Sequence, residues 1–269
     1  MRSLPHPAPR ARRAVGVLVL AALGAGGNTC QTPIGPLPVA PAVEAAVSTL
    51  TYDDSLAAAD SAAIVAELDA RHTLAGPKSK YAKRLDRLVG NARSEDGVAF
   101  NYAVYLSPEV NAFAAADGSV RVYQGLMDMA SDGELQCVIG HEIGHVVLGH
   151  SKEKQQLATM TRAGRDYASR VGGEGGALAQ GQVGAIAESV LNAKFSQSEE
   201  SEADEYGLAF MRRQGADPLG CVTIMEKFAQ LGSRGGGFFD SHPDPKARAD
   251  ALRREIASSQ EDAPVRKAP

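Results

Sequence analysis

Residues 131–150 read SDGELQCVIGHEIGHVVLGH, a pattern typical of a helix built into a protein core. Ser131 can accept hydrogen bonds from the free amides of a first helical turn, and Glu134, three residues later, completes a capping box. Most of the following positions are apolar: Leu135, Val138, Ile139, Ile143, Val146, Val147 and Leu148. A helix that is apolar on nearly all sides belongs in a core. We therefore predict a central buried helix that begins after Ser131.

Three polar side chains interrupt this apolar helix: His141, Glu142 and His145. Burying them without partners is energetically costly. At roughly 100° per residue the two histidines lie about 40° apart on one face, so their imidazoles can share one tetrahedral cation. Glu142 lies beside them, where a carboxylate can take a proton from a water that the metal activates. This H-E-x-x-H pattern predicts a hydrolytic zinc site.

The histidines could also match this pattern by chance. In a chain with six histidines, a random H-E-x-x-H match has a frequency on the order of one in a hundred. His150 follows His145 by five residues, about 140° round the helix, so we do not expect it to share the metal. We expect His150 at the C-terminal end of the helix instead, where a cationic imidazole is favourable.

A zinc site of this kind needs a third protein ligand, because catalytic zinc normally keeps three and leaves one position open. Acidic residues are concentrated in residues 198–210, SEESEADEYGLAF, where a third ligand is expected. If this stretch is helical, Glu200 and Asp204 fall on its apolar stripe, and three other acids point to solvent: Glu199, Glu202 and Glu205. A carboxylate on a buried stripe requires a cation, so Glu200 is the expected ligand. Asp204 is placed to accept the N–H of a ligating histidine; the alternative is a solvated acidic helix face.

The first 29 residues have the composition of a secretory signal. Four arginines precede an apolar run from Ala14 to Leu23, which is short for a membrane span, and no acidic residue occurs. Removing this segment takes away four arginines and no carboxylate, so the formal net charge moves from −4 to about −8. An acidic protein without a basic stripe is a poor partner for nucleic acid. We expect an exported protein, located in a bacterial periplasm.

The three cysteines leave alternatives open. Cys30 lies where a bacterial lipoprotein is cleaved and acylated, although the preceding Gly-Asn-Thr at 27–29 is a weak processing sequence. The protein is therefore either anchored by a lipid at Cys30, with the outer membrane as the possible destination, or released into the periplasm or exterior. Cys137 and Cys221 fall in predicted helices, and they either pair in an oxidising compartment or remain buried thiols.

We divide the chain into a signal at 1–29, a Pro-rich spacer at 30–45, one catalytic domain at 46–258 and a disordered tail at 259–269. The domain is expected to be α+β and mainly helical, with a small antiparallel sheet directly before the central helix. Its strands are predicted at Val98–Leu106, Asn111–Ala116 and Ser119–Gln124, with a turn at Asp117-Gly118.

Helices are predicted at seven further places, and a flexible glycine loop at Ser233–Gly237. They are an Ala-rich segment ending near Arg71, the segment after Pro77, a short piece that begins at Gly125, the segment after His150 to about Arg170, Ala179–Ala193, and the segments that start at Asp217-Pro218 and Asp244-Pro245, the last ending near Ser258.

Five short motifs occur in an order that resembles a known family: NAFA at 111–114, GLMD at 125–128, HEIGH at 141–145, the E-x-x-x-D of 200–204 and SHP at 241–243. Through them the chain is similar to the HtpX/BepA class of gluzincin zinc metallopeptidases. Within that class, four stretches resemble the LoiP-like bacterial envelope lipoproteins: YAKRL at 81–85, VNAFA at 110–114, VRVYQGLMDM at 120–129 and HPDPKAR at 242–248. The similarity extends from about Tyr81 to Leu252.

The resemblance implies a zincin-like domain that binds one Zn²⁺ per chain. The ligands it implies are His141, His145 and Glu200, with Glu142 as general base and Asp204 orienting a ligand histidine. It also implies that His242 approaches the metal, either to support the oxyanion or to occupy the open position in a resting state. Arg248 matches an arginine of the family's catalytic site.

The strand that begins at Asn111 is expected to bind substrate. An exposed strand edge can pair with an extended peptide through backbone hydrogen bonds, so Asn111, Ala112, Phe113 and Ala114 are the predicted substrate-binding residues. The expected function is zinc-dependent endopeptidase activity on unfolded or misfolded envelope proteins, in protein quality control. The alternative is a latent zinc-containing, chaperone-like assembly factor whose main role is binding. Glu142 favours the enzyme, because a purely structural zinc site needs no base.

Overall fold

The computed structural model describes residues 53–90, 92–159, 193–232 and 237–261 of the 269-residue chain. Several predicted segments lie outside these residues: the signal, the spacer with Cys30 and all but the last residue of the helix at Ala179–Ala193. The same is true of nearly all of the glycine loop, the C-terminal part of the helix predicted to reach Arg170, and most of the tail. Within the described ranges, no helix combines the length and apolar character that a membrane crossing requires. The described chain is mainly helical, as predicted.

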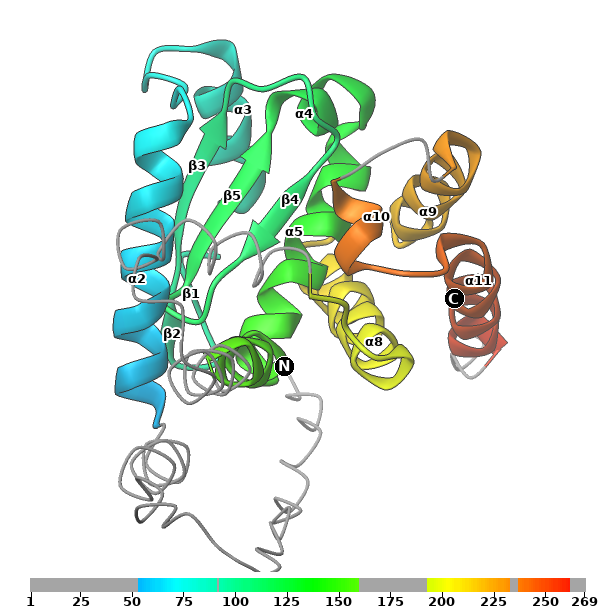
Figure 1. The fold of residues 1–269 in the computed structure, drawn as a ribbon. Helices are drawn as coiled ribbons and strands as arrows, with labels where there is room; N and C mark the ends of the chain where they lie inside the picture. Colours follow the sequence, from blue (N-terminus) through cyan, green and yellow to red (C-terminus); the bar gives the residue numbers. More distant parts are fainter. Residues whose placement is uncertain (1–52, 91, 160–192, 233–236, 262–269) are drawn as a thin grey trace, which may run out of the picture. The chain divides into compact units, whose positions relative to one another are not determined.

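The helices and strands are shown in Figure 1. The helices are α2 (Asp54–Arg71), α3 (Lys80–Val89), α4 (Gln124–Met129), α5 (Asp132–Val147), α8 (Gln197–Arg213), α9 (Leu219–Leu231), α10 (Phe238–Ser241) and α11 (Pro245–Glu261). Residues 150–159 are also helical. The strands are β1 (Ser94–Glu95), β2 (Val98–Ala99), β3 (Asn101–Tyr105), β4 (Ala112–Ala114) and β5 (Ser119–Tyr123).

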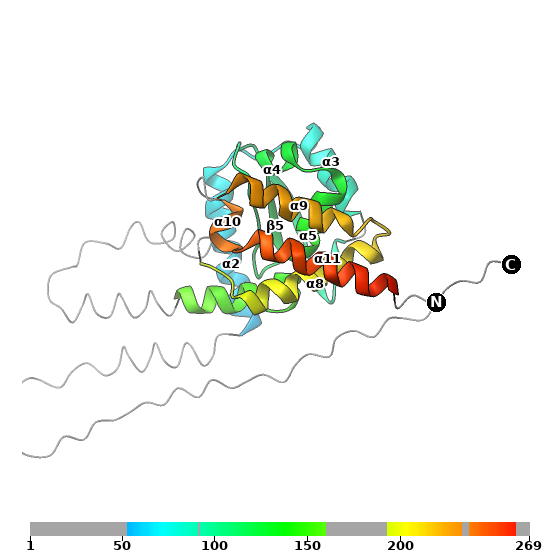
Figure 2. The ribbon, with the colours of Figure 1, turned by 90° about the vertical axis from the view of Figure 1, so that its right-hand side faces the viewer.

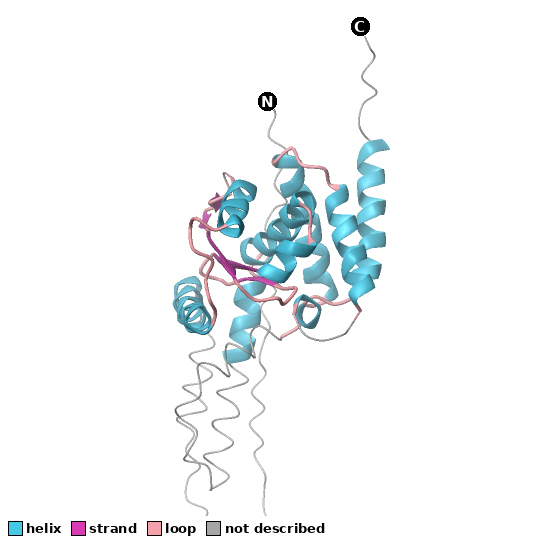
Figure 3. Cartoon of the chain, turned by 90° about the horizontal axis from the view of Figure 1, so that it is seen from above, coloured by secondary structure: helices cyan, strands magenta, loops and turns pink. Residues whose placement is uncertain are grey.

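A three-stranded sheet in the order β3-β5-β4 has helices on both of its faces (Figure 3). β4 and β5 pair antiparallel across the turn at Asp117-Gly118, which confirms the predicted hairpin. β3 runs parallel to β5, so the sheet is mixed and the expectation of a sheet that is antiparallel throughout is corrected. The physical reason is the connection after β3, which carries the chain to the far edge and lets β5 return into the central position.

The central strand β5 is buried at all five positions, because both of its faces are covered. Val120 and Val122 face the main core beneath α3 and α5. Successive side chains point to opposite faces of a strand, so Arg121 and Tyr123 face α2. Arg121 Nε donates to Asp69 Oδ1 of α2 over 2.9 Å, which satisfies a buried guanidinium and attaches the helix to the sheet.

The predicted strand at Val98–Leu106 is interrupted at Phe100, a buried residue. The residues before it form β2, which pairs with β1 in a separate two-stranded hairpin that was not predicted. Asp96 and Gly97 form its turn with φ of 47° and 86°. Asp-Gly is a strong hairpin signal, so this element could have been found in the sequence.

The α5 helix starts as predicted and lies at the centre of the core. Ser131 accepts a hydrogen bond from the Glu134 amide, and the Glu134 carboxylate accepts one from the Ser131 amide. α5 contacts α3, α8, α9 and β4. It ends at Val147, and Gly149 adopts a φ of 87°, which breaks the helical path. The central helix therefore ends three residues before His150, which was expected at its C-terminal end, and His150 instead begins the next helix.

A disulfide joins Cys137 of α5 to Cys221 of α9, 84 positions later in the sequence. Of the two alternatives left open by the sequence, pairing is the one found. Both cysteines are buried. The bond restricts a long loop of the unfolded chain and is typical of proteins from an oxidising compartment.

The helices α5 and α8 approach each other closely at glycines. A Cβ added at Gly140 of α5 would lie 2.7 Å from Phe210 Cδ1, and one added at Gly207 of α8 would lie 3.3 Å from the backbone nitrogen of His141. Gly144 has a similarly close neighbour on α8. Because these three positions carry no side chain of their own, the two helices pack closely, and the acidic residues of α8 reach the histidines of α5.

We expect Gly140→Ala to lower the free energy of unfolding by about 1–3 kcal/mol, because the added methyl group overpacks a contact with a fully buried phenylalanine. Gly133→Ala, in the first turn of the same helix, is the matched control: its added Cβ has nothing within 4 Å. Urea unfolding of both variants measures the difference. If the two variants are equally stable, the close contact between α5 and α8 does not constrain the fold.

Candidate metal centre

Four buried side chains converge beneath the sheet: His141 and His145 of α5, Glu200 of α8, and His242, which follows α10. One possible ligand atom from each lies within 4.8 Å of the others. None of the four is more than 2% exposed. The three predicted zinc ligands are therefore together, and His242 is close enough to be a fourth.

The separations match those of a tetrahedral ligand set. His141 Nε2 lies 3.1 Å from His145 Nε2 and 3.2 Å from His242 Nδ1. Glu200 Oε1 lies 2.8 Å from His242 Nδ1 and 3.4 Å from His145 Nε2. Donors that are about 2.0–2.1 Å from a tetrahedral zinc ion are about 3.3 Å from one another. Lone pairs of ring nitrogens this close together need a proton or a cation between them, so these residues fit a metal ion such as zinc.

Asp204 and Arg248 lie behind the cluster and fix its orientation. His141 Nδ1 lies 3.1 Å from Asp204 Oδ1, so the carboxylate is within reach of the outer ring nitrogen of the predicted ligand. Arg248 donates to both oxygens of Asp204, with Nε–Oδ2 at 2.8 Å and Nη2–Oδ1 at 2.5 Å, and its Nη1 contacts Glu200 Oε2. Burial acts to raise the pKa of Asp204, but the ion pair and hydrogen bonds with Arg248 outweigh it and hold that pKa below its usual range.

The packing of α11 explains how Arg248 reaches this position. α11 lies beside α9 in Figure 2 and also contacts α8. Arg248 is in the first turn of α11, 7% exposed, and its guanidinium extends toward the two carboxylates of α8. The arginine that the family resemblance suggested is therefore in contact with the cluster.

Glu142 lies between the cluster and a pocket. Its Oε1 is 3.4 Å from His242 Nε2 and accepts no hydrogen bond from the residues that the structure describes. Burial raises the pKa of Glu142 to about 7; the charge of His141 opposes this shift and that of Glu200 adds to it. A carboxyl group with a pKa near neutrality can both take and return a proton. Burial also lowers the pKa of His242 to about 4, against the opposing charge of Glu200.

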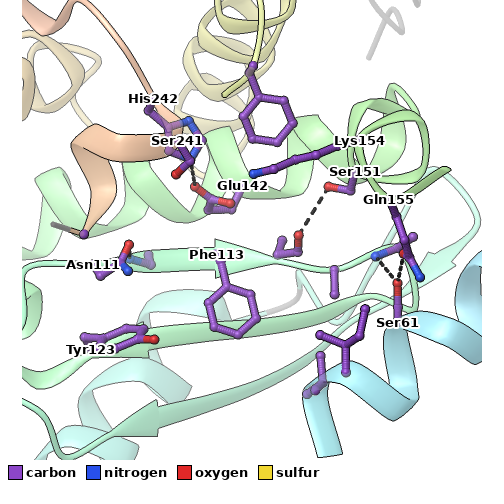
Figure 4. Close-up of a pocket in the computed structure, with 18 of the residues that line it drawn as sticks. Ser61, Asn111, Phe113, Tyr123, Glu142, Ser151, Lys154, Gln155, Ser241 and His242 are labelled. Atoms are coloured by element: carbon purple, nitrogen blue, oxygen red, sulfur yellow. Dashed lines mark hydrogen bonds and ion pairs between the residues drawn. The ribbon is translucent and has the colours of Figure 1, made fainter. Parts of the chain in front are cut away.

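The pocket beside Glu142 has a volume of about 160 Å³ and is shown in Figure 4. One wall is the segment 111–116, which contains β4 and the four predicted substrate-binding residues. The opposite wall is formed by Phe195 and by Ser151, Lys154 and Gln155 of the helix at 150–159. Side chains of α2 close one end. The predicted base and the predicted substrate strand thus line the same pocket.

Three residues of this region were not predicted from the sequence. His150 was expected at the C-terminal end of the central helix, turned away from His145. It is instead buried, with Nδ1 at 3.1 Å from Nδ1 of His145, because the turn at Gly149 redirects the chain. Phe195 stacks on the ring of His145 with centroids 3.7 Å apart. The ammonium of Lys154 lies 4.2 Å from the Phe195 ring centroid, and burial lowers its pKa to about 8.

The fold and the site together define a zincin-like metallopeptidase. Two histidines and a glutamate of an H-E-x-x-H helix meet a carboxylate from a later helix, and the edge strand of a small sheet lines the adjoining pocket. This is the arrangement of a hydrolytic metal site, in which side-chain ligands, a base and a place for an extended peptide lie together.

Comparison with known proteins agrees. The family model of peptidase family M48 matches residues 79–256. The chain is 44% identical over 195 residues to Metalloprotease LoiP of Escherichia coli (strain K12), covering 71% of this chain and 77% of that protein. It is 42% identical over 215 residues to Metalloprotease YcaL of the same organism, covering 78% and 83%. It is 32% identical over 184 residues to that organism's Beta-barrel assembly-enhancing protease, covering 62% and 37%.

The chain therefore belongs to peptidase family M48 and is a metalloendopeptidase that acts on proteins. This result confirms the family that the sequence motifs indicated.

The buried guanidinium of Arg248 gives a test of the site's electrostatics. In metal-free protein, we expect Arg248→Met to lower the free energy of unfolding by about 3–5 kcal/mol, because it leaves two buried carboxylates without their counter-charge. Arg253→Met on the same helix is the control, since it removes only exposed ion pairs worth about 1 kcal/mol or less. Urea unfolding with a chelator present measures both, and equal losses would show that Arg248 does not compensate the carboxylates.

Proposed function

We propose that this metalloendopeptidase uses zinc, one ion per chain, with His141, His145 and Glu200 as ligands. The observation that carries the proposal is the convergence of these three buried side chains beside Glu142 and an open pocket. Imidazole nitrogens with a carboxylate oxygen are the donor set that catalytic zinc commonly takes. The spacing of the donor atoms agrees with it.

In the proposed reaction, water is added across the peptide C–N bond. A bound zinc ion supplies a Lewis acid that polarises the scissile carbonyl and lowers the pKa of water. Glu142 takes a proton from the attacking water and returns it to the leaving amine, so the carboxylate is regenerated at the end of the cycle. Asp204 holds the proton on Nδ1 of His141, which leaves the Nε2 lone pair directed at the site. Arg248 keeps Asp204 and Glu200 in place.

We place the substrate peptide, in extended form, along the outer edge of β4. β5 occupies the other edge of this strand, and the register of the hairpin turns the backbone groups of Ala112 and Ala114 outward. Three of these groups have local partners: Asn111 Oδ1 accepts from the Ala112 amide, Ser151 Oγ donates to the Ala114 carbonyl, and the Ala114 amide donates to the Glu142 carboxylate. A bound peptide would exchange these contacts for backbone hydrogen bonds.

We further propose that the substrates are unfolded or misfolded proteins of a bacterial envelope and that the chain acts there in protein quality control. Three observations support an exported location: the signal-like first 29 residues, Cys30 directly after them, and the disulfide between Cys137 and Cys221. A relative bears the name Beta-barrel assembly-enhancing protease. Acylation of Cys30 would anchor the protein, with the outer membrane as the proposed site; without acylation it would be released into the periplasm.

The second candidate function is that of a latent, chaperone-like assembly factor, and His242 is the observation that favours it. Its Nδ1 takes the place of a fourth ligand, and its ring stacks on Phe238 with centroids 4.1 Å apart. Catalytic zinc keeps one position open. We therefore propose that His242 closes the site at rest and must move before a peptide is cleaved.

We expect Glu142→Gln to bind zinc and fold like the wild type but to lose about 10²- to 10⁴-fold in hydrolysis, because only the base is removed. Glu200→Ala should instead lose zinc affinity, since two ligands hold the ion poorly. Glu205→Ala, at an exposed position of the same helix, is the control for both measurements. Metal analysis and casein digestion are the assays; undiminished cleavage by Glu142→Gln excludes the mechanism, and full zinc occupancy in Glu200→Ala excludes that ligand.

The kinetics of His242→Ala on small unstructured peptides distinguish a blocking role of His242 from a role in the transition state. If the histidine closes the site at rest, the variant should be more active than the wild type. A large fall in kcat with little change in KM would mean that His242 serves the transition state and does not block the metal. Unchanged kinetics would leave it only a structural role.

A further inference from the structure

We infer that His150 positions the proposed zinc ligand His145, as the middle member of a chain of contacts: a hydrogen bond joins the rings of His145 and His150, and an ion-pair contact joins His150 to Glu202. His150 Nδ1 lies 3.1 Å from His145 Nδ1, and His150 Nε2 lies 3.5 Å from Glu202 Oε2. Both histidines are buried, whereas the Glu202 side chain is 40% exposed. The inference rests on the proposed zinc site, because it concerns the state in which His145 is a ligand.

The number of protons on two neutral imidazoles determines which histidine donates the hydrogen bond and which accepts it. A neutral imidazole has one N–H donor and one lone pair, so two Nδ1 atoms 3.1 Å apart can form a hydrogen bond only if one donates and the other accepts. His145 directs its Nε2 into the metal cluster, 3.1 Å from His141 Nε2, and a ligand nitrogen must carry a lone pair. His145 therefore donates from Nδ1. His150 accepts, and its own proton lies on Nε2, which faces the carboxylate.

The local backbone produces this contact. In a continuous helix His150 would be about 140° away from His145. Instead α5 ends at Val147, and Gly149 has a φ of 87°, a conformation that favours glycine. The helix at 150–159 then begins at His150 with its ring against His145. The glycine of the sequence LGH thus converts a residue on the wrong face of the helix into a partner of the ligand.

Phe195 and His150 together leave the His145 ring one orientation. The Phe195 ring stacks on it at an interplanar angle of 18°, which fixes the plane of the imidazole. The hydrogen bond to His150 fixes which nitrogen points outward within that plane. Without an acceptor at Nδ1, the proton of His145 can move to Nε2 and the lone pair can leave the metal cluster.

The two histidines of the H-E-x-x-H motif are thus held by different partners. Asp204 accepts the outer N–H of His141 and is itself held by Arg248. His150 does the same for His145 and is itself held by Glu202, which lies on α8 two residues after the proposed ligand Glu200. Asp204 and Glu202 both lie on α8, so the helix that supplies the proposed ligand Glu200 also contributes to the support of each ligand histidine.

The test compares His150→Leu with His150→Asn in the purified full chain. Asn places an acceptor oxygen near the position of Nδ1, whereas Leu has a similar size and no acceptor. Zinc affinity is measured by competition with a chromophoric chelator, and the ligand geometry by the visible absorption spectrum of the Co²⁺-loaded protein. We expect His150→Leu to raise the zinc Kd about 10- to 100-fold and to alter the cobalt spectrum. His150→Asn should stay close to the wild type in both.

Equal zinc affinity in the wild type and His150→Leu overturns the inference. An equal loss of zinc affinity in His150→Leu and His150→Asn also overturns it, because His150 would then act only through packing. If His150→Leu does not fold, Glu202→Leu replaces it, with Glu205→Leu on the same helix as control. A rise in the zinc Kd for Glu202→Leu but not for Glu205→Leu supports the chain of contacts, and no difference between the two variants overturns it. If the wild type itself binds no zinc, the proposed function is wrong. The variants do not enter into that result, so it can be told apart from a failure of the inference about His150.

Discussion

The burial of two carboxylates against the histidines of α5 is the constraint on which the rest of the structure depends. Glu200 and Asp204 are 2% and 7% exposed, and buried charges are costly unless they are paired. Arg248 supplies one positive charge to both carboxylates. A metal ion between Glu200 and the histidines would supply the second. The glycines at the contact of α5 and α8 let the two helices approach closely, so that Glu200 and Asp204 of α8 lie beside the histidines of α5.

Other parts of the fold hold this arrangement from outside. The disulfide ties α5 to α9, and α9 packs against α11, which carries Arg248. On the pocket side, the edge strand β4 lies beside Glu142, and Gly237 adopts a φ of 88° where an added Cβ would meet the Val110 carbonyl at 2.8 Å. This glycine lets the segment before His242 pass close to the residues that lead into β4. The ligands, the base and the proposed substrate edge are therefore positioned by elements that are far apart in the sequence.

Much of the site follows from local pattern, and the remainder depends on tertiary contacts. The spacing of His141 and His145 places them on one face of a helix, and helical geometry separates the buried Glu200 and Asp204 from the exposed Glu205. The family motifs indicate His242 and Arg248 as well. In contrast, the partnership of His150 with His145 depends on one positive φ at Gly149, and the stacking of Phe195 depends on how a distant segment returns. The parallel pairing of β3 with β5 also escaped prediction, because alternation within a strand does not specify its neighbours.

A crystal of the zinc-loaded protein, with diffraction data collected on both sides of the zinc absorption edge, tests the account most directly. The anomalous difference map should show one peak per chain, about 2.0–2.1 Å from Nε2 of His141, Nε2 of His145 and a carboxylate oxygen of Glu200. If His242 closes the site at rest, its Nδ1 should lie at the same distance. A map with no peak among these side chains, or with zinc bound elsewhere on the chain, would contradict the assignment of this site as the metal centre.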